Sequence, residues 1–136
     1  MTRLQLAAGG RRLEASHVLS VPPEDVWDLL VDVRRWPEWS PIIRGVDATD
    51  GRVRTGTTGR IRVPGLWLPF AVTDRTDRRW TWRIAGVSAT GHRVDELADD
   101  RCRVVFELPP TAVGYAPVCL RALERIESVL EDEPVR

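Results

Sequence analysis

The amino-acid sequence predicts an α+β fold in which a curved antiparallel sheet wraps around one long C-terminal helix. Between residues 42 and 108, short segments of alternating apolar and polar side chains follow one another and are separated by turn residues, which is typical of an antiparallel meander. From about residue 111 to 131 the apolar residues instead recur at helical spacing. Because a sheet must cover its apolar face, one amphipathic helix across a strongly curved sheet accounts for both patterns and leaves a cavity beneath it.

The length and composition favour one soluble domain spanning residues 1–136. We expect a loose N-terminal tail over 1–10, before the first strand, and a frayed C-terminal tail over 132–136. Apolar residues make up 43% of the chain and charged residues 29%, an ordinary globular composition. The formal net charge is zero, so no overall field attracts nucleic acid or an anionic membrane.

The ends of the chain and its basic residues give a second set of expectations. The N-terminal segment has no apolar stretch long enough for a signal peptide, and no run approaches the roughly 20 apolar residues of a membrane helix. We therefore expect a cytoplasmic protein without membrane insertion. All 20 basic residues are arginine, which a GC-rich bacterial genome explains and which excludes Schiff-base chemistry on a lysine.

The sequence predicts neither a metal site nor a cofactor. Cys102 and Cys119 lack the spacing of a zinc site or a redox pair, and both stand in apolar patterns. No second histidine lies at ligand spacing from His92. The glycines form neither a phosphate-binding loop nor a dinucleotide fingerprint.

The chain is expected to open with a strand followed by short helices. Residues 13–21 alternate apolar and polar, which indicates a strand. Residues 20–25 then carry two prolines and two acids suited to a helix start, and the helix should run to about Val33 or Arg34. Pro37 forbids continuation, so residues 36–41 form a proline-punctuated turn with room for a short helix.

Six further strands and the long helix complete the expected order. The strands are predicted at 43–48, 57–63, 66–74, 79–85, 88–97 and 101–108, which gives a sheet of about seven strands. In the last block, Cys119, Leu123, Ile126 and Leu130 share one helical face. Pro117 fits only the first turn, so the regular helix should begin near Tyr115 or Ala116.

Alternation along the strands indicates which side chains point toward the helix. The apolar faces supply a mostly aliphatic and aromatic lining, which is the composition of a small-molecule pocket. The candidate ligand-binding residues are Trp36, Trp39, Phe70, Trp80, Trp82, His92, Val94, Phe106, Tyr115, Cys119 and Leu123. Trp80 and Trp82 either fill the core or form the cavity wall. Trp36 and Trp39 either line the mouth or plug one end of the sheet.

His92 is the polar residue of most interest because its strand phase points it inward. It is either a buried neutral histidine or a polar anchor, or general acid or base, inside the cavity. The hydroxyl of Tyr115 would lie at the mouth unless that residue serves only in packing. If the protein is an enzyme, His92 and Tyr115 are the candidate catalytic residues.

Two segments resemble a known family. Val21-Pro22-Pro23-Glu24-Asp25-Val26-Trp27-Asp28-Leu29-Leu30 and Trp36-Pro37-Glu38-Trp39-Ser40-Pro41-Ile42 closely resemble the opening of the polyketide cyclase/dehydrase-like branch of the START-related (SRPBCC) superfamily. The resemblance covers residues 13–130 and implies a helix-grip fold. It is specific for the fold and not for function, because members include ligand carriers, aromatases and cyclases. The chain departs from the family in its proline-rich segment 108–117.

Three functions are compatible with these observations, and whether the protein is an enzyme stays open. The first is binding of a small hydrophobic or aromatic ligand, lipid- or polyketide-like, in the internal cavity. The second is a polyketide cyclase or aromatase that uses the same cavity. The third is a protein-interaction module with a collapsed cavity. The expected partner is a small hydrophobic molecule and not nucleic acid, and a homodimer through an exposed edge is compatible with the pattern.

Overall fold

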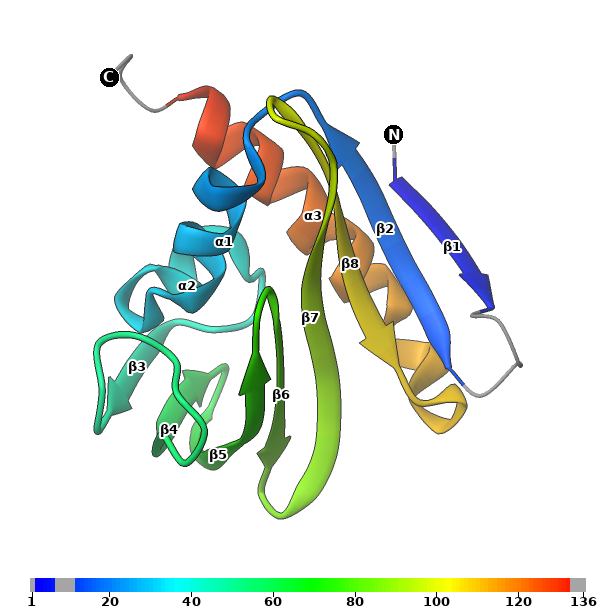
Figure 1. The fold of residues 1–136 in the computed structure, drawn as a ribbon. Helices are drawn as coiled ribbons and strands as arrows, with labels where there is room; N and C mark the ends of the chain where they lie inside the picture. Colours follow the sequence, from blue (N-terminus) through cyan, green and yellow to red (C-terminus); the bar gives the residue numbers. More distant parts are fainter. Residues whose placement is uncertain (1, 7–11, 133–136) are drawn as a thin grey trace.

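The computed structural model describes residues 2–6 and 12–132. Within them lies one antiparallel sheet in the order β1-β2-β8-β7-β6-β5-β4-β3 (Figure 1). The strands are β1 (Thr2–Leu6), β2 (Leu13–Leu19), β3 (Gly45–Ala48), β4 (Thr58–Val63), β5 (Leu66–Thr76), β6 (Arg79–Ile84), β7 (Val87–Ala98) and β8 (Arg101–Leu108). The helices are α1 (Pro23–Val31), η1 (Val33–Arg35), α2 (Trp36–Trp39), η2 (Pro110–Tyr115) and α3 (Ala116–Glu131). The predicted α+β helix-grip architecture is confirmed.

The N-terminal strand corrects two expectations. Residues 2–6, expected as part of a loose tail, form β1 and pair antiparallel with β2, with Leu4 opposite Ala15. The sheet therefore has eight strands among the described residues, where about seven were expected. Five residues of alternation are too short to identify a strand, whereas the free edge of β2 supplies the backbone partners. Residues 1, 7–10 and 133–136 of the expected tails lie outside the described residues.

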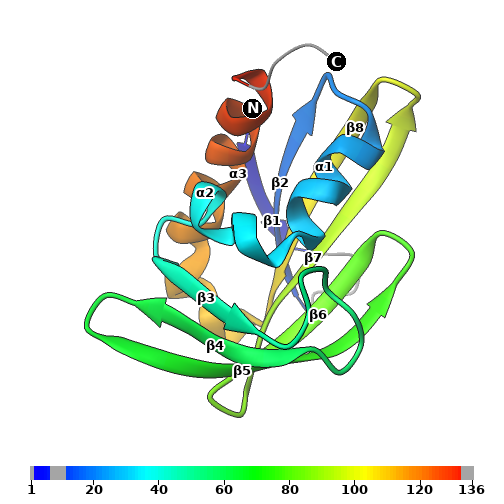
Figure 2. The ribbon, with the colours of Figure 1, turned by 90° about the vertical axis from the view of Figure 1, so that its left-hand side faces the viewer.

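The first helix is shorter than expected because the backbone extends at Asp32. Pro23 occupies the first turn of α1, as the sequence predicts, and Asp32 ends the helix with φ −81° and ψ 101°. The Asp32 side chain then accepts a hydrogen bond from the backbone N–H of Arg34 and begins η1. Figure 2 shows the short helices beside α3, above the β3–β4–β5 end of the sheet.

The long helix lies across the concave face of the sheet, as predicted. α3 begins at Ala116 with Pro117 in its first turn. Its buried face consists of Ala116, Cys119, Ala122, Leu123 and Ile126. Opposite this face, Ala15, Leu19 and the inward residues of β8 are fully or almost fully buried, so the helix and the sheet form one continuous apolar core. No helix in the described part of the chain is long and apolar enough to cross a membrane.

Candidate functional site

Tryptophan side chains fill much of the space where the sequence suggests a cavity. Trp36 stacks on Trp80 with ring centroids 5.3 Å apart and an angle of 9° between the planes. Trp82 meets both rings edge-on, at 5.2 Å from Trp36 and 5.4 Å from Trp80. Phe70 contacts Trp36 at 5.3 Å. We call Trp36, Phe70, Trp80 and Trp82 the aromatic plug, because they close this part of the interior with favourable edge and stacked contacts.

Local structure explains why Trp36 belongs to this plug. It begins α2 directly after η1, and its indole Nε1–H donates a hydrogen bond of 3.0 Å to the carbonyl of Leu30 at the end of α1. Trp36 is completely buried and Trp39 nearly so. Trp36 therefore belongs to the plug, whereas Trp39 lines the small recess described below, and neither forms an open mouth.

His92 lies against the plug and is almost completely buried. Its imidazole ring stacks on the Trp80 ring, with the ring centroids 4.0 Å apart, and forms an edge contact with the Phe106 ring, with the centroids 4.9 Å apart. Its Nε2 lies 2.9 Å from the hydroxyl of Thr90, and that hydroxyl accepts a hydrogen bond of 3.1 Å from Trp82 Nε1–H. The Nδ1 atom has no hydrogen-bond partner in the described residues. Burial lowers the pKa of His92 to about 3, so the ring is neutral at pH 7.

Beside His92 lies a small recess in the interior. Its volume is about 20 Å³, and its walls are Trp39, Ser40, Ile43, Trp82, Thr90, His92, Phe106, Tyr115, Val118, Cys119 and Ala122. A volume of this size admits about one water molecule. The recess by itself therefore cannot hold an organic ligand.

A larger apolar cleft opens from the same place, between η2 and strands β4 to β7. Its volume is about 300 Å³. Its walls are Ile42, Ile61, Val63, Leu68, Trp82, Ile84, Ala89, Thr90, Pro109, Ala112 and Tyr115. Trp82, Thr90 and Tyr115 line the recess as well, so the two spaces meet at these residues. We call this space the η2 cleft.

Polar groups in the η2 cleft are few. Thr90 and Tyr115 contribute the hydroxyl groups of its lining, and the Trp82 indole N–H is already bonded to Thr90. The Tyr115 hydroxyl forms no hydrogen bond with the described residues and stays free for another partner. Burial raises the pKa of Tyr115 far above its ordinary value and, in the adjoining recess, raises that of Cys119 to about 12. The cleft is therefore apolar and uncharged at neutral pH.

The structure divides the predicted ligand-binding residues into two groups. Trp39, Trp82, His92, Phe106, Tyr115 and Cys119 line the recess, and Trp82 and Tyr115 also line the η2 cleft. Trp36, Phe70, Trp80, Val94 and Leu123 belong to the buried core and line neither space. Among the described residues, His, Cys, Asp and Glu form no group of three or more that could hold a metal ion.

Several cleft residues are not among the predicted ligand-binding residues. Strand phase places Ile61, Val63 and Leu68 on inward faces, but it does not distinguish the wall of a cleft from the filled core. Ala112 could not be identified in this way, because it lies in a 3₁₀ helix that proline positions and not periodicity define. Strand phase also places Thr90 on the same face as His92, two positions away in β7, but it does not show that the Thr90 hydroxyl lines the cleft.

Comparison with known proteins places this geometry in context. A family model described as "Polyketide cyclase / dehydrase and lipid transport" matches residues 11–130. The protein XoxI from Bacillus cereus has a TM-score of 0.71 at 18% identity, over 89% of this chain and 96% of that chain. A START superfamily protein from Mycobacterium smegmatis has a TM-score of 0.70 at 15% identity, over 90% and 98%. The Zhui aromatase/cyclase from a Streptomyces species has a TM-score of 0.68 at 15% identity, over 89% and 93%.

At these identities the solved structures share the fold, and their activities do not carry over. No curated protein matches the chain significantly.

Proposed function

Because the chain belongs to the polyketide cyclase/dehydrase and lipid transport family, we propose that it binds a small apolar or aromatic molecule in the η2 cleft. The observation that carries this proposal is the cleft itself, an uncharged space of about 300 Å³ with a largely aliphatic wall. Ligand sites are typically concave and mostly apolar, with a few placed polar groups, and the η2 cleft has this composition.

The size of the cleft limits the ligand. A volume of about 300 Å³ lies at the lower end of the range for ligand sites. The aromatic plug occupies the interior that a long acyl chain would need. The proposal therefore favours a compact aromatic or alicyclic molecule over an extended lipid.

The free hydroxyl of Tyr115 is the proposed polar anchor. A ligand oxygen in the η2 cleft can pair with this hydroxyl without breaking any hydrogen bond within the described residues. His92 acts one step away, because its Nε2 pairs with Thr90 and holds that hydroxyl against Trp82. In this arrangement His92 positions the wall of the cleft and does not contact the ligand.

Binding is favoured over catalysis because neither His92 nor Tyr115 has a pKa near neutral pH. General acid-base chemistry works best with a pKa close to the working pH. The pKa of His92 is about 3, and that of Tyr115 is raised by burial. A cyclase or aromatase that uses these two residues is therefore the second candidate. The filled interior is the observation that favours an interaction module as the third.

The proposal can be tested with 2-naphthol, a compact aromatic molecule with one hydroxyl, by isothermal titration calorimetry. Ala89→Phe places a ring in the η2 cleft, and we expect it to weaken binding at least about tenfold, equivalent to about 1.4 kcal/mol. Ser88→Phe, on the same strand at an exposed position that pairs with exposed Arg83 and lies outside the cleft, is the matched control and should keep the wild-type affinity.

Equal affinity in the wild type and Ala89→Phe would exclude the η2 cleft as the binding site. Absence of binding across 2-naphthol and a panel of other aromatic and acyl compounds would favour the interaction module.

A further inference from the structure

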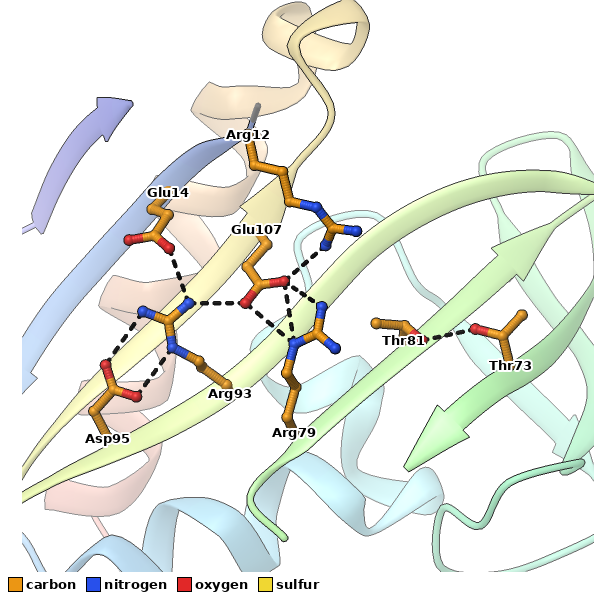
Figure 3. A network of polar contacts seen from close by, with 8 residues as sticks. All are labelled: Arg12, Glu14, Thr73, Arg79, Thr81, Arg93, Asp95 and Glu107. Atoms are coloured by element: carbon orange, nitrogen blue, oxygen red, sulfur yellow. Dashed lines mark hydrogen bonds and ion pairs between the residues drawn. The ribbon is translucent and has the colours of Figure 1, made fainter. Parts of the chain in front are cut away.

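The outer face of the sheet, opposite to α3, carries a compact ionic network centred on Glu107 (Figure 3). The Glu107 carboxylate accepts hydrogen bonds from Arg12 at 2.8 Å, Arg79 at 2.6 Å and Arg93 at 2.8 Å. These contacts lower the pKa of Glu107 to about 2 against the opposing effect of burial. Gly91 lies opposite Glu107 in the neighbouring strand, and a Cβ there would stand 2.7 Å from its Oε1.

The network balances its own charges. Arg93 reaches two more carboxylates, Glu14 at 2.9 Å and Asp95 at 3.0 Å. The network thus contains three arginines and three acids, and each carboxylate accepts a hydrogen bond from at least one guanidinium group. Arg93 bridges the three acids and is fixed in place by them.

Two further arginines, Arg3 and Arg103, stand beside this network. Arg3 on β1 and Arg103 on β8 form no ion pair with the residues in 2–6 and 12–132. Strand register places Arg3 directly opposite Ser16, and Arg103 opposite Val18, two residues along the same strand. Both arginines therefore stand on the outer face, on either side of β2.

These two arginines border a depression of about 400 Å³. Its walls are Arg3, Gln5, Glu14, Ser16, Val18, Arg93 and Arg103. Ser16 is buried, and its hydroxyl forms no hydrogen bond within the described part of the chain. Three positive side chains and one negative side chain leave an excess of two positive charges. The one acid, Glu14, is already paired with Arg93.

We propose that this depression binds a phosphate group. The guanidinium groups of Arg3 and Arg103, which form no ion pair with the described residues, supply hydrogen-bond donors together with the Ser16 hydroxyl and the Gln5 amide. Arginine forks match phosphate oxygens well. A volume of about 400 Å³ exceeds that of a phosphate ion, so the bound group can be a phosphate monoester. The site lies on the opposite face of the sheet from the η2 cleft and does not depend on the function proposed there.

Inorganic phosphate and glycerol 3-phosphate are the probes that test this site, by calorimetry at constant ionic strength. We expect Arg103→Gln and Arg3→Gln each to weaken binding at least about tenfold, because each removes a charge-assisted contact. Arg121→Gln is the matched control: Arg121 is exposed on α3 and has no ion pair within residues 2–6 and 12–132, so its loss should leave the affinity unchanged. Tighter binding of glycerol 3-phosphate than of inorganic phosphate would identify an ester as the preferred source.

Absence of binding of both probes to the wild type would overturn the proposal. An equal loss in Arg103→Gln and Arg121→Gln would do so as well, because it would show attraction by overall charge. Arg103 lies on β8, inside the sheet, and not on the edge strand β1. Weaker binding by Arg103→Gln would therefore report loss of the phosphate contact and not a displacement of β1.

Discussion

His92 shows how one residue type can belong to either a catalyst or a core. Strand phase correctly points its ring inward. The stacking on Trp80 and the depressed pKa, which together make it a neutral packing and positioning residue, depend on neighbours from β6 and β8. No sequence pattern within β7 contains that information. His92 therefore has the geometry of a buried neutral histidine, with the Thr90 hydroxyl as its hydrogen-bond partner.

The buried state of His92 predicts that stability falls as the solution becomes acidic. The folded pKa of about 3 lies below the ordinary 6.5, so between these values the unfolded chain binds a proton that the folded chain does not. Stability is therefore full above pH 6.5 and declines toward pH 3. Between pH 7 and pH 5 we expect a loss of about 2 kcal/mol from this residue alone, measured by urea unfolding.

His92→Phe is the control for this pH dependence, because it keeps an aromatic ring beside Trp80 and removes the titrating group. The variant should show a pH 7 to pH 5 difference smaller by about the same 2 kcal/mol, whatever its absolute stability. An unchanged pH dependence would show that His92 is not the group responsible. Because the comparison uses the change in unfolding free energy between pH 7 and pH 5, it separates the effect of His92 titration from any effect of the substitution on packing.

At the scale of single elements, the sequence predicted whether a segment is a helix or a strand better than it predicted where that helix or strand begins and ends. The long helix and its proline-containing first turn were predicted because an amphipathic helix of sixteen residues gives a strong pattern. β1 was missed because its pairing with β2 is a tertiary contact. The early end of α1 was missed because Asp32 leaves the helix to cap η1, a local competition that periodicity does not reveal.

The fit between β7 and β8 predicts the effect of a methyl group at Gly91. A Cβ at this position would stand 2.7 Å from Glu107 Oε1 and 3.3 Å from its carboxyl carbon, so the buried carboxylate would have to leave its arginines. We expect Gly91→Ala to reduce the free energy of unfolding by about 1–3 kcal/mol. Gly114→Ala is the control, because a Cβ there meets nothing within 4 Å. Equal stability of Gly91→Ala and the wild type in urea unfolding would contradict the close fit.

At the scale of the molecule, the fold places two chemically opposite spaces on the two faces of one sheet. The inner face meets α3 and leaves the η2 cleft, uncharged and apolar. The outer face carries the Glu107 network and the arginine-lined depression. Alternation along the strands predicts this separation of apolar and charged faces. It could not predict how far tryptophans fill the inner space, because that depends on rings from α2 and β6 that meet only after folding.

The central claim, that a compact aromatic ligand occupies the η2 cleft, is tested most directly by nuclear Overhauser effects between bound 2-naphthol and protein methyl groups. The account predicts contacts with Ile61, Ala89 and Ala112, which line the cleft from three different elements. Contacts with Leu29 or Leu123, buried in the core beyond the cleft lining, would show instead that the plug opens and would contradict the account.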